Sequence, residues 1–309
     1  MITVLVPDDH GRRALEGRPG LRALRYDLES DPGPEEQEAA ALVVGMAEDR
    51  VDLVTAYLAR LPRLRLLQTL NAGYDQWVAG LPSGVALANA RGAHGAAVAE
   101  WVAAVLLAHS RRLDVFARAQ AEGRWQLQLT DSLQGKAVAV LGAGDIGTNV
   151  RRLLEPFGAS VTLLGRTARD GVRPMAELDA VLGDLDVVVL ALPVTEETTG
   201  LVDGGFLGRL KDGAVLVNAG RGVLVDTGAL LAAMAQGRIS AILDVTDPEP
   251  LPAGHPLWSA PGVTITPHVA GATPGIWRRA WQVAGDQLET LARGETPANL
   301  VVDPEDLRD

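Results

Sequence analysis

Hydrophobic residues along this chain of 309 residues fall into short runs, and longer stretches with helical spacing separate them. Such alternation is typical of parallel βαβ units. Runs without polar interruption, such as Val187–Leu190, suit strands that are covered on both faces. The pattern therefore predicts an α/β fold. The predicted strands are Ile2–Val6, Leu42–Gly45, Leu66–Leu70, Val85–Ala90, Ala137–Leu141, Ser160–Leu164, Asp186–Leu192, Ala214–Asn218, Ala241–Val245 and Val263–Thr266.

Two helical patterns bear on the domain organisation. The first, from about Ala96 to Leu113, is apolar around most of its circumference, so it should be buried on several sides. It fits either a plain core helix or a helix at an interface between domains or subunits. The second, from about Pro274 to Arg293, is long enough to return to the first domain. The length of the chain allows about two domains.

The net charge and the lack of cysteine narrow the function classes. A formal net charge of −11 argues against binding to nucleic acid or to an anionic membrane, because both select basic surfaces. An anionic substrate would need a local cation. Without cysteine the chain has no disulfide, no thiolate nucleophile and no cysteine-ligated zinc, and we expect no metal site.

The sequence also bears on localisation. The segment Met1–Pro7 lacks the basic start and apolar stretch of a signal peptide, and it resembles a first strand. The longest apolar stretch, Trp101–Ala108, is too short to span a bilayer. We therefore expect a cytoplasmic protein.

A glycine motif follows the strand Ala137–Leu141. Gly142–Gly147 fits GxGxxG, and it opens a helix that should run to about Phe157. In such a turn the first glycine permits the tight bend, the second lets the backbone approach a pyrophosphate, and the third allows close helix packing. Backbone N–H groups at the helix start would face the phosphates. The alternative is a glycine turn that serves packing only.

The end of the next strand bears on which dinucleotide is bound. An NAD site usually carries an acid there, roughly twenty residues on, for the ribose 2′-hydroxyl. This chain has Gly165-Arg166-Thr167 instead. A guanidinium can hold a 2′-phosphate with two hydrogen bonds, so we expect NADP(H) to be preferred and NAD(H) to remain open. The alternative is that Arg166 is a solvated loop residue and that both cofactors are accepted.

Three charged residues follow predicted strands further along the chain: Arg221, Glu249 and His268. Ligands of open parallel sheets bind at the strand carboxyl ends. His268 could exchange a proton with a substrate oxygen, because imidazole titrates near neutrality. Glu249 could orient the ring, and Arg221 could hold a substrate carboxylate and polarise a carbonyl. Taken singly, His268 could instead be a structural histidine, Glu249 a solvated turn residue and Arg221 part of a surface ion pair.

With these motifs the sequence resembles the D-isomer-specific 2-hydroxyacid dehydrogenase family over nearly the whole chain. The most specific segments are Asn218–Gly222 and Thr266–His268. The other segments that carry the resemblance are Asn71–Asp75, Asn89–Gly92, Val98–Glu100, Gly123–Trp125, Leu192–Pro193, Thr195–Thr198 and His255–Leu257.

The resemblance implies a Rossmann-type doubly wound parallel sheet inserted into a flavodoxin-like α/β substrate domain. The substrate domain would comprise residues 1–93 and 281–309, and the dinucleotide-binding domain residues 94–280. The helix after Gly92 would pack a homodimer. The substrate would be a small 2-keto acid or its 2-hydroxy acid.

The resemblance also implies residue roles. Arg221 would bind and polarise the 2-keto acid, His268 would be the acid/base, and Glu249 would pair with His268. Asp244 would contact the nicotinamide carboxamide, unless it only caps a strand end. Substrate contacts would come from Ala72, Gly73, Arg221 and His268, although Ala72-Gly73 could be only a turn. The expected cofactor contacts are Gly142, Gly144, Asp145, Ile146, Gly147, Arg166, Thr167, Leu192, Pro193, Thr198, Ala219, Arg221, Asp244 and His268.

Some positions depart from the family pattern. The family often has Phe where this chain has Thr246, and smaller residues are frequent at Tyr74. Gly165-Arg166 looks like the NADPH-using glyoxylate/hydroxypyruvate reductases. We therefore expect an NADP(H)-preferring 2-keto acid reductase. Three other classes share the fold and stay open as alternatives: formate dehydrogenases, phosphite-oxidising relatives and dinucleotide-sensing corepressors. Formate dehydrogenases have Gln where this chain has Glu249.

Overall fold

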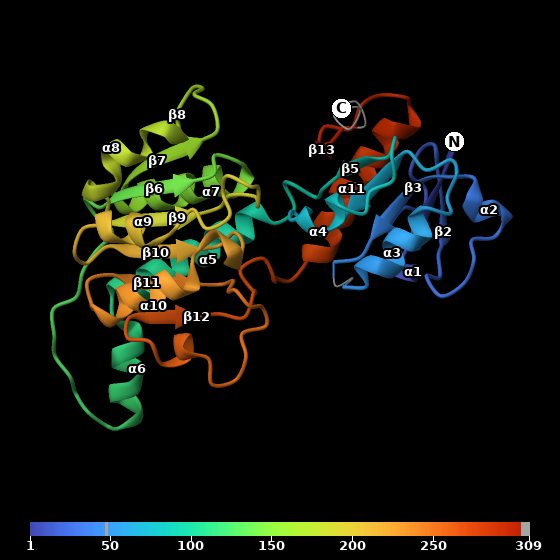
Figure 1. Ribbon diagram of the computed structural model, residues 1–309. Coiled ribbons are helices and arrows are strands. Elements are labelled where there is room, and N and C mark those ends of the chain that lie inside the picture. The colour runs from blue at the N-terminus through green and yellow to red at the C-terminus, as the bar shows by residue number, and fades with distance from the viewer. Residues whose placement is uncertain (47–48, 304–309) are drawn as a thin grey trace. The chain divides into compact units, whose positions relative to one another are not determined.

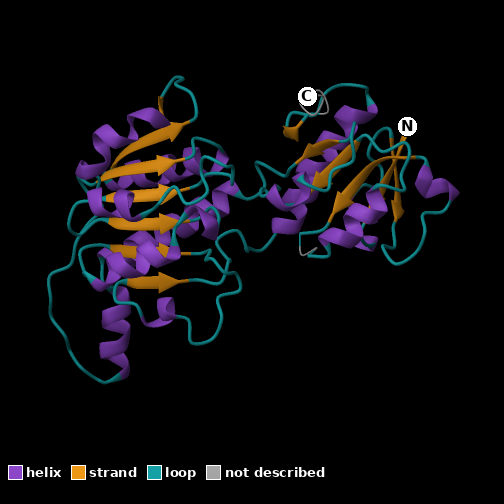
Figure 2. Cartoon of the chain, in the orientation of Figure 1, coloured by secondary structure: helices purple, strands orange, loops and turns teal. Residues whose placement is uncertain are grey.

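The computed structural model describes residues 1–46 and 49–303, and it divides the chain into two compact units (Figure 1). Unit 1 comprises Met1–His94 and Pro274–Asp309, and unit 2 comprises Gly95–Thr273. Each unit is a sheet with helices on both faces, as the colouring by secondary structure shows (Figure 2). No helix among the described residues is long and apolar enough to cross a membrane.

Unit 1 contains a six-stranded sheet in the order β13-β5-β4-β3-β1-β2. All neighbouring strands are parallel except β13 and β5. Without β13, the order is that of flavodoxin-like folds. The strands are β1 (Ile2–Val6), β2 (Leu21–Arg25), β3 (Ala39–Val44), β4 (Leu66–Thr69), β5 (Ala86–Ala88) and β13 (Leu300–Val302).

Two apolar layers sandwich this sheet, because side chains of a strand alternate between its faces. Leu15, next to α1, and Trp281 of α11 pack on one face, and Val54 and Tyr57 of α3 pack on the other, together with Trp77 of α4. The helices are α1 (Asp9–Ala14), α2 (Pro34–Gln37), α3 (Val51–Leu58), α4 (Asp75–Val78) and α11 (Ile276–Ala292).

Unit 2 contains a seven-stranded, entirely parallel sheet in the order β12-β11-β10-β9-β6-β7-β8. The order reverses between β6 and β9, which is the switch point of a doubly wound Rossmann sheet. The strands are β6 (Ala137–Leu141), β7 (Ser160–Gly165), β8 (Val172–Pro174), β9 (Val187–Leu190), β10 (Val215–Asn218), β11 (Ser240–Leu243) and β12 (Val263–Ile265).

Helices cover both faces of this second sheet. Those on one face are α5 (Gly95–Ser110) and α7 (Asp145–Leu154), and those on the other are α8 (Leu178–Val181), α9 (Gly204–Arg209) and α10 (Thr227–Ala235). Helix α6 (Leu113–Ala121) follows α5. Short 3-10 helices are η1 (Glu155–Phe157), η2 (Met175–Glu177), η3 (Leu182–Asp184), η4 (Gly222–Leu224) and η5 (Pro256–Ser259).

The predicted α/β class with a doubly wound parallel sheet is confirmed, and the predicted strands agree to within a few residues. The predicted helix from Ala96 to Leu113 is wrong in one respect. Arg112 takes a left-handed conformation with φ 54°, which ends α5 and starts α6. The helix after the glycine motif also ends early, because Pro156 turns its last part into η1.

The boundaries of the two units differ from the predicted domain bounds of 1–93 with 281–309 and 94–280. The second boundary lies before Pro274, earlier than predicted. Helix α11 is continuous from Ile276, and its first turns already belong to unit 1. Arg279 Nε donates to the Ala93 carbonyl at 3.1 Å, and Ala280 is fully buried in the core of unit 1.

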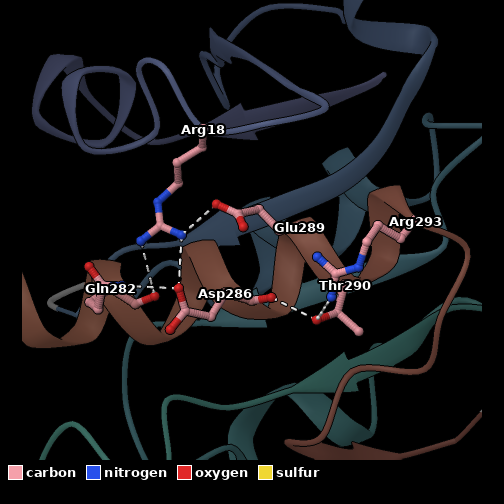
Figure 3. A network of polar contacts seen from close by, with 6 residues as sticks. All are labelled: Arg18, Gln282, Asp286, Glu289, Thr290 and Arg293. Carbon is pink, nitrogen blue, oxygen red and sulfur yellow. Dashed lines mark hydrogen bonds and ion pairs between the residues drawn. The ribbon is translucent and has the colours of Figure 1, made fainter.

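A charged network fixes the returning helix α11 to the segment after α1 (Figure 3). Arg18 Nη1 lies 2.9 Å from both Asp286 Oδ1 and Glu289 Oε1, and its side chain is only 15% exposed. Gly285 makes room for this guanidinium, since a Cβ at that position would lie 2.2 Å from Arg18 Cζ. A side chain at this position of α11 would have to displace the Arg18 guanidinium from its two carboxylates.

We expect Gly285→Ala to destabilise the protein by about 1–3 kcal/mol, because the added methyl collides with the Arg18 guanidinium. In an open helix the same change stabilises by about 0.5–1 kcal/mol. Urea unfolding followed by circular dichroism measures the difference. Gly208→Ala in α9 is the matched control, because a Cβ there meets nothing within 4 Å. A stabilising Gly285→Ala, or one that stays equally harmful after Arg18→Ala, would contradict this explanation.

Candidate active site

The predicted site residues of unit 2 lie in loops at one edge of its sheet. These loops follow β6, β7, β9, β10, β11 and β12, and all these strands are parallel. Their carboxyl ends therefore share one edge, which is the ligand-binding edge of doubly wound sheets.

The glycine turn after β6 has two glycines that the protein itself requires. Gly142 has φ 112°, and a Cβ there would lie 2.2 Å from the Ala191 carbonyl oxygen. A Cβ on Gly147 would lie 2.0 Å from the Gly142 carbonyl oxygen. At Gly144 a Cβ would meet nothing within 4 Å. The second glycine is thus not explained by packing, and its predicted approach to a pyrophosphate stays a prediction.

Two residues of the first turn of α7 were also predicted as cofactor contacts. Asp145 Oδ2 accepts a hydrogen bond from the Gly95 N–H at 3.1 Å, and Oδ1 accepts one from Asn149 Nδ2 at 3.0 Å. Its carboxylate therefore ties the glycine turn to the start of α5, which leaves its backbone N–H as the group suited to a phosphate. Ile146 packs on the core beneath α5 and α7.

Arg166 and Thr167 follow β7 directly and are exposed. No hydrogen bond or ion pair joins the Arg166 guanidinium to another described residue, so its five donors are available to a phosphate. The Thr195 hydroxyl donates to Glu197 at 2.7 Å and is the main cause that lowers the pKa of Glu197; the charge of Arg166 adds to this effect.

A second arginine of this loop was missed by sequence reasoning. Arg169 Nη2 donates to the Ala143 carbonyl at 2.6 Å, which joins the loop to the glycine turn. Two backbone hydrogen bonds between Arg169 and Val172 close the loop. The pair of arginines in Arg166-Thr167-Ala168-Arg169 was the available signal, but which of them faces outward depends on the backbone.

The loop after β9 contains three further predicted cofactor contacts. Thr198 Oγ1 donates to the Pro193 carbonyl at 2.8 Å and accepts from the Thr195 N–H at 2.8 Å. The Thr198 hydroxyl thus stabilises the turn through hydrogen bonds to its backbone. Leu192 packs partly against the core of the sheet.

Arg221 lies in the loop after β10, half-buried, and its Nη1 donates to the Gly220 carbonyl at 3.0 Å. Ala219, another predicted cofactor contact, donates its N–H to the end of β9 at 3.1 Å. A Cβ on Gly222 would lie 2.0 Å from the Thr246 carbonyl oxygen. The Arg221 loop therefore touches, backbone against backbone, the loop after β11 that carries Glu249.

His268 and Glu249 form a close pair. His268 Nδ1 lies 2.5 Å from Glu249 Oε1, and both side chains are partly exposed, at 50% and 39%. Because Nδ1 faces the carboxylate, Nε2 is the ring nitrogen suited to exchange a proton with a substrate. A cavity of about 280 Å³ borders the pair, with apolar walls from Leu251, Trp258 and Ile265.

Asp244 supports the loop of His268, and its predicted contact with the nicotinamide carboxamide stays a prediction. Its buried carboxylate accepts from Thr266 Oγ1 at 2.5 Å, from the Val269 N–H at 2.9 Å and from the Ala270 N–H at 2.9 Å. Its backbone carbonyl accepts from the His268 N–H at 2.7 Å. His268 itself has φ 53°, a conformation that non-glycine residues adopt rarely. Asp244 thus holds the His268 loop from both sides, in place of a simple cap at the strand end.

Ala72 and Gly73, the predicted substrate-binding backbone, lie in unit 1 between β4 and α4. Asn89 Nδ2 donates to the Ala72 carbonyl at 2.7 Å, which fixes the turn. Their predicted role stays a prediction. Among residues 1–46 and 49–303, no group of three or more His, Asp or Glu side chains could hold a metal ion.

A doubly wound sheet, a GxGxxG turn between a strand and a helix, and a His–Glu pair at the same edge are features of nicotinamide-dependent oxidoreductases. The family model described as D-isomer specific 2-hydroxyacid dehydrogenase, NAD binding domain, matches residues 103–270, which lie within unit 2.

Comparisons over the whole chain agree. A glyoxylate reductase of Aeropyrum pernix is 33% identical over 285 residues, covering 86% of this chain and 83% of the relative. A glyoxylate/hydroxypyruvate reductase B of Yersinia enterocolitica is 32% identical over 290 residues, covering 89% and 88%. A crystal structure of a D-isomer specific 2-hydroxyacid dehydrogenase from Xanthobacter autotrophicus, in complex with NADPH and MES, superposes with a TM-score of 0.83 at 31% identity, covering 99% of both chains. This chain belongs to the D-isomer specific 2-hydroxyacid dehydrogenase family.

The different surroundings of Gly144 and Gly147 give a matched pair of variants. We expect Gly144→Ala to keep the thermal midpoint but to weaken NADPH binding at least about tenfold, because the added methyl meets no protein atom but would meet the predicted pyrophosphate. Gly147→Ala should lower the thermal midpoint of the protein alone, because its methyl meets the Gly142 carbonyl. Calorimetry measures both quantities. Tight NADPH binding by Gly144→Ala would mean that the pyrophosphate lies elsewhere.

Proposed function

We propose that this protein is an NADP(H)-preferring oxidoreductase that interconverts a small 2-keto acid and its D-2-hydroxy acid, and that it works as a 2-keto acid reductase. The observation that carries the proposal is the His268–Glu249 pair, 2.5 Å apart, on loops of adjacent strands next to the loop of Arg221. The glyoxylate and hydroxypyruvate reductases among the relatives favour substrates of this class.

The cofactor would be held by the turn Gly142–Gly147 and by the loop after β7. The open approach at Gly144 suits a pyrophosphate, and the exposed guanidinium of Arg166 beside Thr167 suits a 2′-phosphate. Leu192, Pro193 and Ala219 lie on the neighbouring loops and would line the path of the dinucleotide. When bound, the reduced nicotinamide supplies the hydride that reaches the keto carbon.

The residues of the chain would handle the carboxylate and the proton. Arg221 supplies the local cation that an acidic protein needs for an anionic substrate, and its charge polarises the adjacent carbonyl. His268, protonated, gives the proton on Nε2 to the oxygen of the keto group as this oxygen gains charge. Glu249, at Nδ1, stabilises the imidazolium before the transfer and fixes the ring orientation. In the oxidative direction the same groups act in reverse.

Several finer points belong to the same proposal. Unit 2 acts as the dinucleotide-binding domain and unit 1 as the substrate domain, with backbone amides near Ala72 and Gly73 binding the substrate carboxylate. Asp244 can still meet the nicotinamide carboxamide, since each carboxylate oxygen has about two acceptor sites. A cytoplasmic homodimer remains the expected state, packed through the helix after Gly92.

The experiment that tests the proposal is a panel of 2-keto acids with NADPH and NADH, compared by kcat/KM from nicotinamide absorbance. Glyoxylate, hydroxypyruvate, pyruvate and phenylpyruvate should be included, with phosphite and formate as the rival donors in the oxidative direction. We expect reduction of at least one small keto acid. His268→Ala should lower kcat by about 100-fold or more with little change in NADPH affinity, because it removes the proton donor. No turnover by the wild type, or full turnover by His268→Ala, would refute the proposal.

Arg166→Ala tests the cofactor preference. The change should weaken NADPH much more than NADH, by roughly tenfold or more in the ratio of Kd values, because only NADPH carries the 2′-phosphate. Titration calorimetry with both cofactors measures the ratio. Arg173→Ala is the control, since this arginine is paired with Glu177 on the same unit. Equal losses for the two cofactors would show that Arg166 does not read the 2′-phosphate.

A further inference from the structure

Asn218, the last residue of β10, is a polar side chain that is almost completely buried, at 1% exposed. Both ends of its amide are used within the loop that follows. Oδ1 accepts from the Gly220 N–H at 3.1 Å, and Nδ2 donates to the Arg221 carbonyl at 2.8 Å. One side chain thus closes the backbone on either side of the Gly220-Arg221 peptide bond.

The surroundings of Asn218 leave this loop little freedom. The Asn218 carbonyl accepts from the Asp244 N–H at 3.0 Å, so the strand end is fixed to β11. A Cβ on Gly220 would lie 2.8 Å from Leu224 Cδ1, and one on Gly222 would meet the Thr246 carbonyl. The loop is therefore restricted by packing at Gly220 and Gly222 and by the hydrogen bonds of the Asn218 amide.

We propose that Asn218 is a positioning residue for Arg221: its amide sets the backbone from which the guanidinium reaches the substrate carboxylate. Arg221 has an extended backbone, with φ −142° and ψ 148°, and its carbonyl points to Asn218 Nδ2. This inference rests on the proposed function in one respect, namely that Arg221 binds the carboxylate of the keto acid. It assigns to the Asn of Asn218-Ala219-Gly220-Arg221-Gly222 a task that only an amide performs, because the site needs one acceptor and one donor on the same planar group.

An aspartate in place of Asn218 would have the same shape and the wrong chemistry. Its carboxylate still accepts from the Gly220 N–H, but it cannot donate to the Arg221 carbonyl, and two oxygens would then face each other. The buried negative charge would also offer the Arg221 guanidinium a partner inside the protein. A serine adds no charge, but its single, shorter hydroxyl cannot replace both the Oδ1 and the Nδ2 contacts of the amide.

The test compares Asn218→Asp and Asn218→Ser with the wild type. We expect the KM for glyoxylate to rise about 10- to 100-fold, because a displaced guanidinium binds the carboxylate poorly. The Kd for NADPH should change less than threefold. Asn299→Ser is the matched control: Asn299 is a buried asparagine of unit 1 that donates to the carbonyls of Asn89 and Arg91. It should lower the thermal midpoint and leave KM unchanged.

A double-mutant cycle separates positioning from general damage. If Asn218 acts through Arg221, Asn218→Ser should have almost no further effect on KM once Arg221→Ala is present. Additive losses, or a parallel loss of NADPH affinity, would overturn the inference.

A binding measurement keeps the inference separate from the proposed function. Oxalate, a planar two-carbon anion, should bind the protein–NADP complex about tenfold or more weakly in Asn218→Ser than in the wild type. A wild type that binds oxalate but reduces no keto acid would refute the reductase proposal and leave the role of Asn218 intact. Equal oxalate affinity in both proteins would refute the role of Asn218, whatever the turnover.

Discussion

The Asp244 carboxylate is the interaction on which the geometry of the site depends. It is buried at the end of β11 and accepts three hydrogen bonds from residues on both sides of His268. Hydrogen bonds to an ionised acceptor contribute about 1.5–3 kcal/mol each. That is enough to hold His268 at φ 53°, a conformation that costs of order 1–3 kcal/mol. The imidazole meets Glu249 because these three hydrogen bonds hold the backbone beneath it.

The other half of the site is connected to this loop through close backbone packing. Gly222, next to Arg221, abuts the Thr246 carbonyl, and Thr246 precedes Glu249 on the same loop. A displacement of the Arg221 loop would therefore push on the loop of the carboxylate, and the reverse also holds. Three charged groups from three loops can keep a common geometry because those loops leave adjacent parallel strands and touch through glycine.

The sequence predicted the parts of the fold that depend on uninterrupted apolar runs. The central strands β6, β9 and β10 are of this kind, and the glycine motif was recognised by its place between a strand and a helix. The edge strand β2, Leu-Arg-Ala-Leu-Arg, was not predicted, because charged residues interrupt a strand that is only half-covered. The break at Arg112 was not predicted either, since no glycine or proline marks it.

Within the site, sequence reasoning identified residues by their chemistry but could not assign those whose role depends on backbone direction. Arg221, Glu249 and His268 were identified because they follow strands of one parallel sheet, at the carboxyl ends where ligands bind. For Asp244 the sequence indicated a ligand contact, which stays a prediction, but it did not indicate the hydrogen bonds from the carboxylate to the His268 loop. Asn218 belongs to the motif Asn218–Gly222, but no role was predicted for it. Its two hydrogen bonds, with Gly220 and Arg221, depend on the conformation of the loop.

The same distinction explains how an acidic protein can bind two anionic ligands. The net charge of −11 repels anions at long range, but salt screens it beyond about 8–10 Å. Binding then depends on cations that are fixed at short range. Arg166 is exposed after β7, and Arg221 is half-buried after β10. An exposed guanidinium attracts any anion, so the loop would favour a phosphate that also reaches Thr167 and the glycine turn. At Arg221 the protein itself fixes the geometry, because the amide of Asn218 holds the backbone of this loop. We therefore attribute the choice of anionic ligand at Arg166 and Arg221 mainly to the groups around each arginine, and only secondarily to its charge.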